Sequence, residues 1–545
     1  GEAALLRLAG SLLGIPLGVG IAHLGLEPMQ EVLSKIFFAM EASTVEVGAE
    51  VFVAAVVAGV LTAVAAALVP ALLASRETPA AAVRRIPPLP TWRYRFSQVA
   101  SSGLLLVAGV LCVACRDRLL PRVGMYAGLG LVVLGALLAT PLLTAVLARL
   151  LQPLSRHCLG IEGRLAADNL VRAPGRTGLV IAALAAGVGL VMETAGVIRS
   201  NRIALRDWVK EAIAADLIVT AGSPVSAGGQ SLPLSETLGA RIRQMAAVEA
   251  MLPARMRHQF FRDTQILMVA VNANEVYRAV AQRPGIKGVE EYRALSERPD
   301  GVIISENFGI LHRVKVGDTF TVTSLNGSVE LHVVGQLVDY SWNHGSILIN
   351  RALYLKHWED RRIDLYDVYL KSGADSRAVQ EAILKAHGAA HGLFVLRKEE
   401  LQSHIDETIE QLYGIAFGQQ VVVMFVAALG VVTALLISVL QRRRELGLLR
   451  AIGASRLQVI RSVLAEALLM GVIGTLIGLL VSVPLQWYAL RIVMLEETGY
   501  SFPVHIPWAA SLWIALASLA TATLAGLGPA LFAIRQRIPE AIALE

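Results

Sequence analysis

The feature that most limits how this chain can fold is a series of apolar runs, each long enough to cross a lipid bilayer. About 20 apolar residues suffice to span the hydrocarbon core, and these runs carry almost no charge. Because the bilayer interior offers no water to satisfy backbone N–H and C=O groups, each run must be helical. The eight predicted spans are residues 4–21, 51–73, 99–115, 125–147, 178–197, 414–440, 467–490 and 508–532.

The composition agrees with a membrane protein. Hydrophobic residues make up 55% of the chain and charged residues only 17%, whereas soluble proteins carry about 25% charged residues. The net charge of +6 does not indicate nucleic acid, because the arginines cluster beside apolar runs, a pattern typical of membrane topology. Cys112, Cys115 and Cys158 lie in or near predicted spans, so no disulfide framework is expected in the long polar stretch of residues 199–412.

Loop charge predicts how the spans are oriented, since cytoplasmic loops carry an excess of Lys and Arg. Arginine clusters follow the second, fourth, sixth and eighth spans, at residues 76–95, 149–176, 442–461 and 535–537. On an alternating path these four loops share one side, which is then cytoplasmic, and residues 199–412 project from the other side. One short loop dissents, because Arg116, Arg118 and Arg122 fall on the outer side. We expect a multi-pass protein of the plasma (inner) membrane.

The polar stretch of residues 199–412 has the pattern of a folded α/β domain. Apolar and polar residues alternate at 319–325 and 329–335, and Asn326 and Gly327 between them favour a type I′ hairpin turn. Helical patterns are predicted at residues 200–214, 234–245 and 376–386. The expected fold class is therefore a mainly α-helical polytopic membrane protein, with about eight transmembrane helices and an extracytoplasmic α/β domain.

An internal repeat links the two ends of the chain. Glu2, Gly10 and Gly14 recur at one constant offset as Glu466, Gly474 and Gly478, and Gly18 and Ser482 continue the two rows. Small residues four apart let helices approach closely in lipid, so both rows are expected to pack against other helices. The earlier copy begins at Glu2 without the span, outer domain and basic loop that precede Glu466. We therefore expect that the chain lacks a front part.

The segment after the sixth span carries the most distinctive motif, QRRRELGLLRAIGASR at residues 441–456. Leu446, Leu449 and Ile452 recur at helical spacing, which favours a short helix lying along a partner's groove. Gly453 is expected to end this helix, and Ser455 to cap the next one.

This motif resembles that of the FtsX/MacB-like permeases, the mechanotransducing class of ABC transporters. In that family a basic stretch, a Glu, an apolar-Gly pair, Leu-Arg and Gly-Ala-Ser directly follow a membrane span. The matching residues are Glu445, Gly447, Arg450, Gly453 and Ala454. The resemblance covers residues 414–545 and, as a truncated first copy, residues 1–84. Two extra spans between the copies are similar to those of the larger, duplicated ten-span branch.

The resemblance implies a coupling helix that docks on a separate ATPase. The implied coupling residues are Arg442, Arg443, Arg444, Glu445, Leu446, Gly447, Leu449, Arg450, Gly453, Ala454 and Ser455. No G-x-x-x-x-G-K-[ST] phosphate loop occurs in the sequence, so ATP and Mg would be bound by the partner ATPase. We find no catalytic residue and expect no cofactor in this chain. His387 and His391 stand four apart but fail the zincin pattern, so no metal site is predicted.

The implied domain organisation has five parts. They are a truncated FtsX-like module (1–84), a linking region with two spans (85–177), a transmembrane helix (178–198), an extracytoplasmic MacB-like α/β domain (199–412) and a second FtsX-like module with the coupling helix (413–545).

The implied function is that of the permease subunit of an ABC transporter, which exports or extracts an amphipathic or extracytoplasmic substrate such as a lipoprotein, lipid, peptide or drug. The alternative is an FtsX-type signalling or scaffold protein that activates an extracytoplasmic partner without transport. A secondary transporter is disfavoured because polar groups on the spans are scarce; Glu193, toward the outer end of the fifth span, either lines a path or is interfacial. The expected partners are an ABC ATPase and the lipid bilayer, with an accessory periplasmic or outer protein left open and no nucleic acid.

Overall fold

A computed structural model describes residues 92–535, apart from 119–121, 173, 222–231, 284, 389–390 and 442, together with Gly14, Val53 and Val57. The first two predicted spans therefore lie outside the described residues, except for these three positions. The contacts given below fall within one compact unit, which comprises Ser97–Asp406 and Ala416–Glu545.

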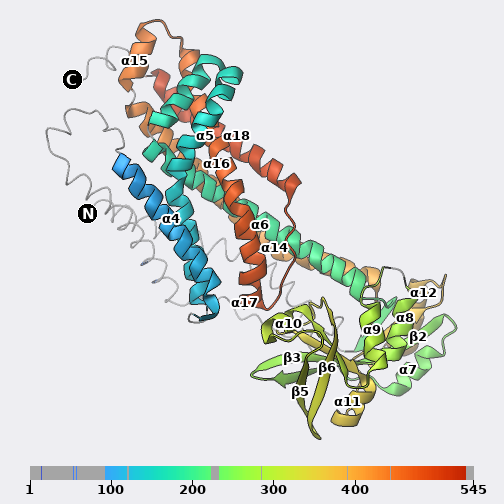
Figure 1. Cartoon of the computed structure of the whole chain (residues 1–545). Coiled ribbons are helices and arrows are strands. Elements are labelled where there is room, and N and C mark those ends of the chain that lie inside the picture. Colours follow the sequence, from blue (N-terminus) through green and yellow to red (C-terminus); the bar gives the residue numbers. More distant parts are fainter. Residues whose placement is uncertain are drawn as a thin grey trace. The chain divides into compact units, whose positions relative to one another are not determined.

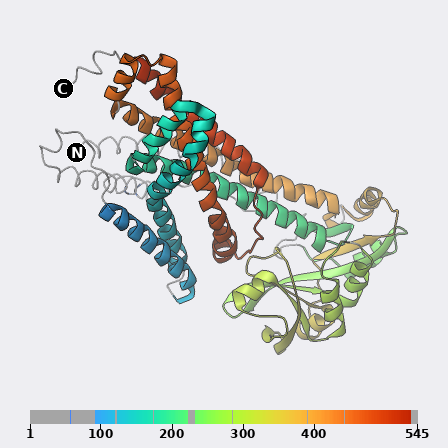
Figure 2. The ribbon, with the colours of Figure 1, turned by 45° about the horizontal axis from the view of Figure 1, so that its top comes forward.

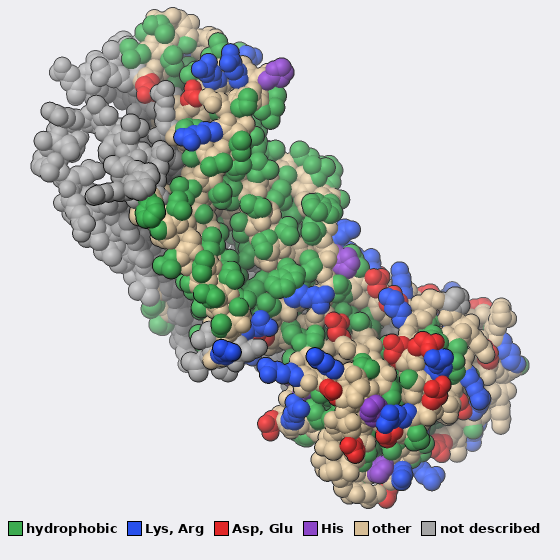
Figure 3. Space-filling view, in the orientation of Figure 1, with side chains coloured by type: hydrophobic (Ala, Val, Ile, Leu, Met, Phe, Trp, Pro, Cys, Tyr) green, Lys and Arg blue, Asp and Glu red, His purple; other side chains and the backbone are tan. Residues whose placement is uncertain are grey.

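Long apolar helices form the membrane part of the molecule (Figures 1 and 2). Within the described residues, five helices are long and apolar enough to cross a membrane, and a helix pair bent by 63° adds a sixth. These six coincide with the third to eighth predicted spans. They are α4 (Trp92–Ala114), α5 (Val123–Arg172), α6 (Pro174–Ala212), α14 (Lys398–Gln441) with α15 (Arg443–Ala451), α16 (Arg456–Tyr488) and α18 (Trp508–Arg535). Figure 3 shows hydrophobic side chains covering these helices, whereas charged side chains gather on the sheet domain.

Residues 149–172 of the arginine-rich segment are helical, although the sequence suggested a loop. Helix α5 continues to Arg172 and breaks at Gly160, where φ is 66° and ψ is −141°. Gln152 Nε2 donates to Asp168 Oδ1 at 2.7 Å, whereas 16 residues of straight helix would rise about 24 Å. Helix α5 therefore folds back on itself at Gly160, at a backbone conformation that favours glycine.

Between α6 and α14 the chain forms a mixed sheet of nine strands in the order β5-β6-β4-β7-β3-β2-β8-β1-β9. Pairs β3–β7 and β4–β6 are parallel. The strands are β1 (Leu217–Ala221), β2 (Val248–Phe261), β3 (Thr264–Val271), β4 (Gly301–Ser305), β5 (Thr319–Ser324), β6 (Gly327–Leu337), β7 (Ser346–Asn350), β8 (Leu365–Leu370) and β9 (Leu393–Arg397). The predicted α/β domain is confirmed.

Short helices pack on this sheet and close its apolar clusters. They are α7 (Glu236–Arg243), α8 (Ala273–Ala281), α9 (Val289–Glu297), α10 (Glu306–His312), α11 (Arg351–Trp358) and α12 (Ser376–Ile383). The largest fully buried side chains of the domain, Trp358, Tyr354 and Phe308, come from α11 and α10 and fill one cluster. The helical predictions at 234–245 and 376–386 correspond to α7 and α12.

The predicted hairpin exists, but its turn is of a different type. Ser324 pairs with Gly327 across β5 and β6. The central residues of this turn are therefore Leu325 and Asn326, and neither is among the residues of positive φ, whereas a type I′ turn needs positive φ at both. Gly327, with a φ of 107°, follows them as the first residue of β6. Asn326 is held instead by bonds from its backbone N–H to Ser324 Oγ (3.2 Å) and from its side chain to Glu359 Oε1 (3.1 Å).

Candidate functional site

The predicted coupling segment forms the short helix α15, which a tight turn joins to α16. Gly453 has a φ of 107°, and the next N–H, that of Ala454, donates to the carbonyl of Leu449 at 2.9 Å. This is the bond that closes a helix end through a left-handed glycine. Ser455 then caps α16, because its Oγ accepts from the N–H of Gln458 while the Gln458 side chain accepts from the N–H of Ser455. The predicted end of one helix and start of the next are confirmed.

The two faces of α15 have different surroundings. Leu446 is only 6% exposed and Leu449 packs beside it in the chain's own core. Leu448 and Ile452, one turn apart, are 48% and 81% exposed, and Leu457 on α16 is also exposed. Leu446 is therefore not available to line a partner's groove, and Leu448, which the sequence analysis missed, belongs to the open face. The core that covers Leu446 consists of Val439, Val459, Val463, Ala530 and Ala533.

Polar contacts tie α15 and its neighbours together at this end of the helices. Arg450 Nη1 donates to the carbonyl of Ile534 in the last turn of α18 at 3.2 Å. Ser438 on α14 donates to Glu466 Oε1 on α16 at 3.0 Å, and the Glu466 side chain is buried. A carboxylate without a partner is costly inside a membrane. The hydrogen bond from Ser438 to Glu466 therefore favours a fixed arrangement of α14 and α16.

The remaining predicted coupling residues differ in exposure. Glu445, Gly453 and Ser455 are exposed, Gly447 is buried and Ala454 is half-buried. Arg442 lies outside the described residues, and the backbone of Arg443 and Arg444 forms the first turn of α15.

Small residues set the spacing of α6 and α16. A Cβ atom placed on Gly474 would lie 2.8 Å from Leu184 Cδ2, and one on Gly478 would lie 2.8 Å from the carbonyl oxygen of Ala185. Ser482 is 3% exposed on the same helix. Helices α6 and α16 therefore approach more closely here than larger side chains would allow. Of the first row, Gly14 is described and exposed, while Gly10 and Gly18 lie outside the described residues.

Glu193 lies on the same helix interface. It stands four residues after Gly189 and three before Gly196, spacings that place all three on one face of α6. A Cβ on Gly189 would lie 3.4 Å from the carbonyl oxygen of Gly478, and one on Gly196 would lie 2.3 Å from Gln486. The Glu193 side chain is half-buried beside this interface.

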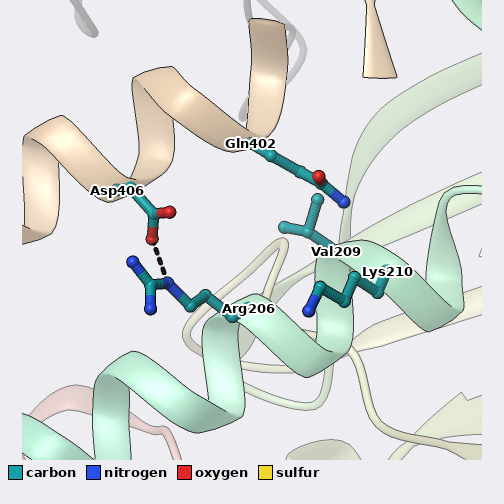
Figure 4. A pocket seen from close by; sticks show the side chains of 5 residues that line it. All are labelled: Arg206, Val209, Lys210, Gln402 and Asp406. Atoms are coloured by element: carbon teal, nitrogen blue, oxygen red, sulfur yellow. Dashed lines mark hydrogen bonds and ion pairs between the residues drawn. The ribbon is translucent and has the colours of Figure 1, made fainter. Parts of the chain in front are cut away.

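Helices α6 and α14 also connect the membrane part to the sheet domain. The 39 residues of α6 rise about 58 Å, well beyond a hydrocarbon core of about 30 Å. Arg206 Nε donates to Asp406 Oδ1 at 2.5 Å across the two helices (Figure 4). Lys398 Nζ donates to the carbonyls of Lys210 (3.1 Å) and Ile213 (2.6 Å), which fixes the start of α14 to the end of α6. A pocket of about 150 Å³ lies between them, lined by Arg206, Val209, Lys210, Gln402 and Asp406.

Two of the three arginines that opposed the predicted orientation, Arg116 and Arg122, have acidic partners. Arg116 Nε lies 3.0 Å from Glu496 Oε1, and Arg122 Nε lies 3.4 Å from Glu497 Oε1. Tyr126 also donates to Glu497 at 2.9 Å. Both glutamates belong to α17 (Met494–Thr498), which follows α16. The loop between α4 and α5 is therefore bound to the end of α16 that lies opposite α15.

Charged groups inside the sheet domain are paired within the fold. Arg255 Nη1 donates to both carboxylate oxygens of Asp364 at 2.7 Å, and Arg255 Nε donates to Asp360. Burial alone would raise the pKa of Asp360, but hydrogen bonds from Arg362, Tyr354 and Arg255 hold that pKa well below its usual value. These contacts stabilise the loop before β8 and provide no arrangement for catalysis.

Asp367 on β8 is in a different environment. Its cross-strand neighbours are Ile218 and Leu252, so the carboxyl lies within an apolar face of the sheet. Burial raises the pKa of Asp367 to about 7. The group is therefore largely protonated in mildly acidic solution and loses its proton near neutrality.

Two family models match separate parts of the chain. The model of the MacB-like periplasmic core domain matches residues 177–386, and that of the FtsX-like permease C-terminal region matches residues 420–538.

Two curated relatives extend these matches. An uncharacterised ABC transporter permease protein of Mycobacterium tuberculosis is 28% identical over 533 residues, which cover 96% of this chain and 61% of the relative. A macrolide export ATP-binding/permease protein MacB of Bordetella avium is 25% identical over 276 residues, covering 45% of this chain and 41% of that protein. The chain thus spans less than two thirds of the length of these relatives.

Among solved structures, the periplasmic region of MacB from Actinobacillus actinomycetemcomitans aligns with 36% of this chain and 94% of its own length. The identity is 10% and the TM-score 0.26, an overlap too weak to support a shared fold by itself.

Proposed function

This chain belongs to the FtsX/MacB-like family of ABC transporter permeases, and we propose that it is the transmembrane subunit of a transporter driven by a separate ATPase. The proposal follows from the family and from the exposed apolar face of α15. Leu448 (48% exposed), Ile452 (81%) and Leu457 (53%) lie together around the turn between α15 and α16. An amphipathic helix that places such side chains in a groove of a partner is a recurrent mode of recognition.

The internal contacts of α15 support a role in transmitting force. Gly453 and Ser455 make the turn to α16 rigid, and Arg450 holds α18. A displacement of α15 would therefore move α16 and α18 with it. Helix α16 in turn packs on α6 through Gly474 and Gly478, and α6 leads into the sheet domain. By this route nucleotide binding in the ATPase would move the sheet domain.

We place α15 on the cytoplasmic side of the plasma (inner) membrane and the sheet domain outside. The α15 end of α16 and the sheet-domain end lie at opposite ends of that helix, since Arg456 begins it and Arg491, beyond its end, faces Glu306 of α10. The arginines of the 442–461 segment support this placement, because cytoplasmic loops carry an excess of Lys and Arg. The load would be amphipathic or extracytoplasmic, such as a lipoprotein, lipid, peptide or drug. An FtsX-type signalling role would use the same coupling element without moving a substrate.

The docking face can be tested by reversing its polarity. In the full chain co-expressed with its cognate ATPase, the double variant Leu448→Asp and Ile452→Asp should abolish co-purification of the ATPase. The control is Leu325→Asp, which changes an equally exposed leucine in the sheet domain (68% exposed) and should leave the complex intact. Undiminished co-purification with the double variant would contradict the proposal.

A further inference from the structure

A second contact joins the sheet domain to the membrane helices, in addition to the chain connections through α6 and α14. The segment 499–507, between α17 and α18, meets the loop 338–345 between β6 and β7. We call this contact the aromatic joint. Its rings are Trp208, Tyr340, Tyr500 and Phe502.

Tyr340 is the centre of the aromatic joint. Its ring stacks on Phe502 with centroids 5.0 Å apart and an interplanar angle of 29°. It also meets the edge of Trp208 on α6 at 5.8 Å. The Tyr340 hydroxyl donates to the carbonyl of Ser501 at 3.4 Å, and burial, with a smaller contribution from Glu306, raises its pKa to about 12, so it remains a donor at physiological pH. One side chain of the sheet domain therefore contacts both the 499–507 segment and α6.

The backbones on the two sides of the joint also touch. Gly499 has a φ of 73°, and a Cβ atom there would lie 1.7 Å from the carbonyl oxygen of Asn343. No other residue fits at this position without moving the β6–β7 loop. Asn307, buried at the start of α10, holds that loop by donating to the carbonyl of Trp342 at 3.0 Å. The loop is thus well fixed within the sheet domain.

The other side of the joint is fixed to the membrane helices. Helix α16 continues into a π-helical turn, Ala489–Val493, a geometry that is frequent at functional sites. Leu490 in this turn is fully buried against Phe502 and Ala204. Gln486 Nε2 donates to the carbonyl of His505 at 3.1 Å, and the N–H of His505 donates to Ser200 Oγ at 2.9 Å. The 499–507 segment must therefore move with α16 and α6.

Arg491 adds a polar contact at the same place. Its Nη1 donates to Ser501 Oγ at 3.0 Å and lies 3.7 Å from Glu306 Oε1 on α10. Arg491 belongs to the π-helical turn, whereas Glu306 belongs to the sheet domain. Both side chains remain partly exposed, so this contact can break and re-form without burying an unpaired charge.

From these contacts we propose that Tyr340 and Arg491 are positioning residues for coupling. The aromatic joint carries displacement of α16 directly to the sheet domain, in addition to the α6–α14 pair. The inference rests on the proposed function, because an ATPase must supply the displacement. Physically, a second contact at a distance from the α6–α14 pair further restrains rotation of the sheet domain relative to the helix bundle.

The test is a distance measurement that needs no known substrate. In the full chain with its ATPase, Cys112, Cys115 and Cys158 are replaced by serine, and spin labels are placed at Leu325→Cys and at Val53→Cys, an exposed position in the other compact unit. Distances are recorded without nucleotide and with a non-hydrolysable ATP analogue. We expect a nucleotide-dependent shift in the parent protein. Tyr340→Ala and Arg491→Ala should each at least halve this shift, whereas Tyr340→Phe, which keeps the ring, should retain most of it.

The outcomes separate the two proposals. If Tyr340→Ala and Arg491→Ala bind the ATPase and show the full parental shift, the role of the joint is refuted while the proposed function stands. If the parent protein binds no ATPase, or shows no shift, both fail. Arg491→Ala decides the question where Tyr340→Ala does not fold, because the Arg491 side chain is 40% exposed and its loss leaves the core intact.

Discussion

The guanidinium of Arg450 donates to the carbonyl oxygen of Ile534 at 3.2 Å, so the end of α15 is bonded to the last turn of α18. A cation at the C-terminal carbonyls of a helix is also favoured by the helix dipole. This bond makes α15 part of the helix bundle, although its open face points away from it.

Replacement of Arg450 by alanine should separate binding of the ATPase from its stimulation. Because Leu448 and Ile452 remain exposed, the Arg450→Ala variant should still co-purify with the ATPase. Its stimulated ATP turnover should fall several-fold, since α15 can then tilt without moving α18. Turnover per co-purified complex is the measurement. Arg461→Ala, an exposed arginine on the neighbouring turn of α16, is the control; an equal loss in this variant would attribute the effect to charge alone.

The effect of replacing Gly453 should depend on how readily the new residue adopts the backbone conformation at this position, and not on its size alone. No atom lies within 4 Å of a Cβ built there, but φ is 107°. Left-handed conformations cost about 1–3 kcal/mol for residues other than glycine, and asparagine adopts them more readily than alanine. Gly453→Asn should therefore retain more ATPase stimulation than Gly453→Ala, and Gly453→Trp should lose it. Equal activity of all three variants would show that the turn has no part in coupling.

Gly478 should be sensitive to a single methyl group. A Cβ there would lie 2.8 Å from the carbonyl oxygen of Ala185, so Gly478→Ala must push α6 and α16 apart. Overpacking of this kind costs about 1–3 kcal/mol. The thermal unfolding midpoint of the purified protein in detergent should fall, whereas Gly130→Ala on α5, where no neighbour lies within 4 Å, should leave it unchanged. A similar fall in both variants would contradict close α6–α16 packing.

Asp367 should make the stability of the sheet domain depend on pH. Its pKa is raised from 3.8 to about 7, so the folded state binds the proton more tightly than the unfolded state. The resulting stabilisation is complete below about pH 4 and is lost as the pH rises to about 7. The full chain should therefore unfold at a lower temperature at pH 8 than at pH 5.5, and Asp367→Asn should reduce this difference. Asp263→Asn, at an exposed position, should not; if it flattens the profile equally, Asp367 is not the titrating group.

The third to eighth spans were predicted well from the sequence, because apolar length is a property of each segment by itself. The strands of the sheet domain were harder to predict. β5 alternates between exposed and buried residues, so its two-residue period could be recognised in the sequence. All five residues of β4 (Gly301–Ser305), in contrast, are buried. A strand covered on both faces has no alternation to detect.

The candidate site was only partly predicted, because a local pattern does not show which residues the rest of the chain covers. Helical spacing shows which residues of α15 share a face, but not which face the chain's own helices cover. Leu446 was therefore assigned to the partner surface, and Leu448 was overlooked. The aromatic joint was not predicted, because Tyr340 and Phe502 are far apart in the sequence and neither lies in a motif. Arg206 lies on an expected helix, residues 200–214, but Asp406 lies in no predicted helix or span, so the α6–α14 pair was not predicted.

The ion pairs of Arg116 with Glu496 and of Arg122 with Glu497 have a consequence for how the molecule divides into moving parts. Together with the packing of Ala148, Ala166 and Leu170 of α5 against Ile181 of α6 and Ile473 of α16, they make α5 an integral member of the bundle that carries the sheet domain. The sequence places a domain boundary at residue 177. The packing of α5 on α6 and α16, however, means that this residue does not separate two independently moving parts. When α16 shifts, α5 should therefore shift with it, together with α6.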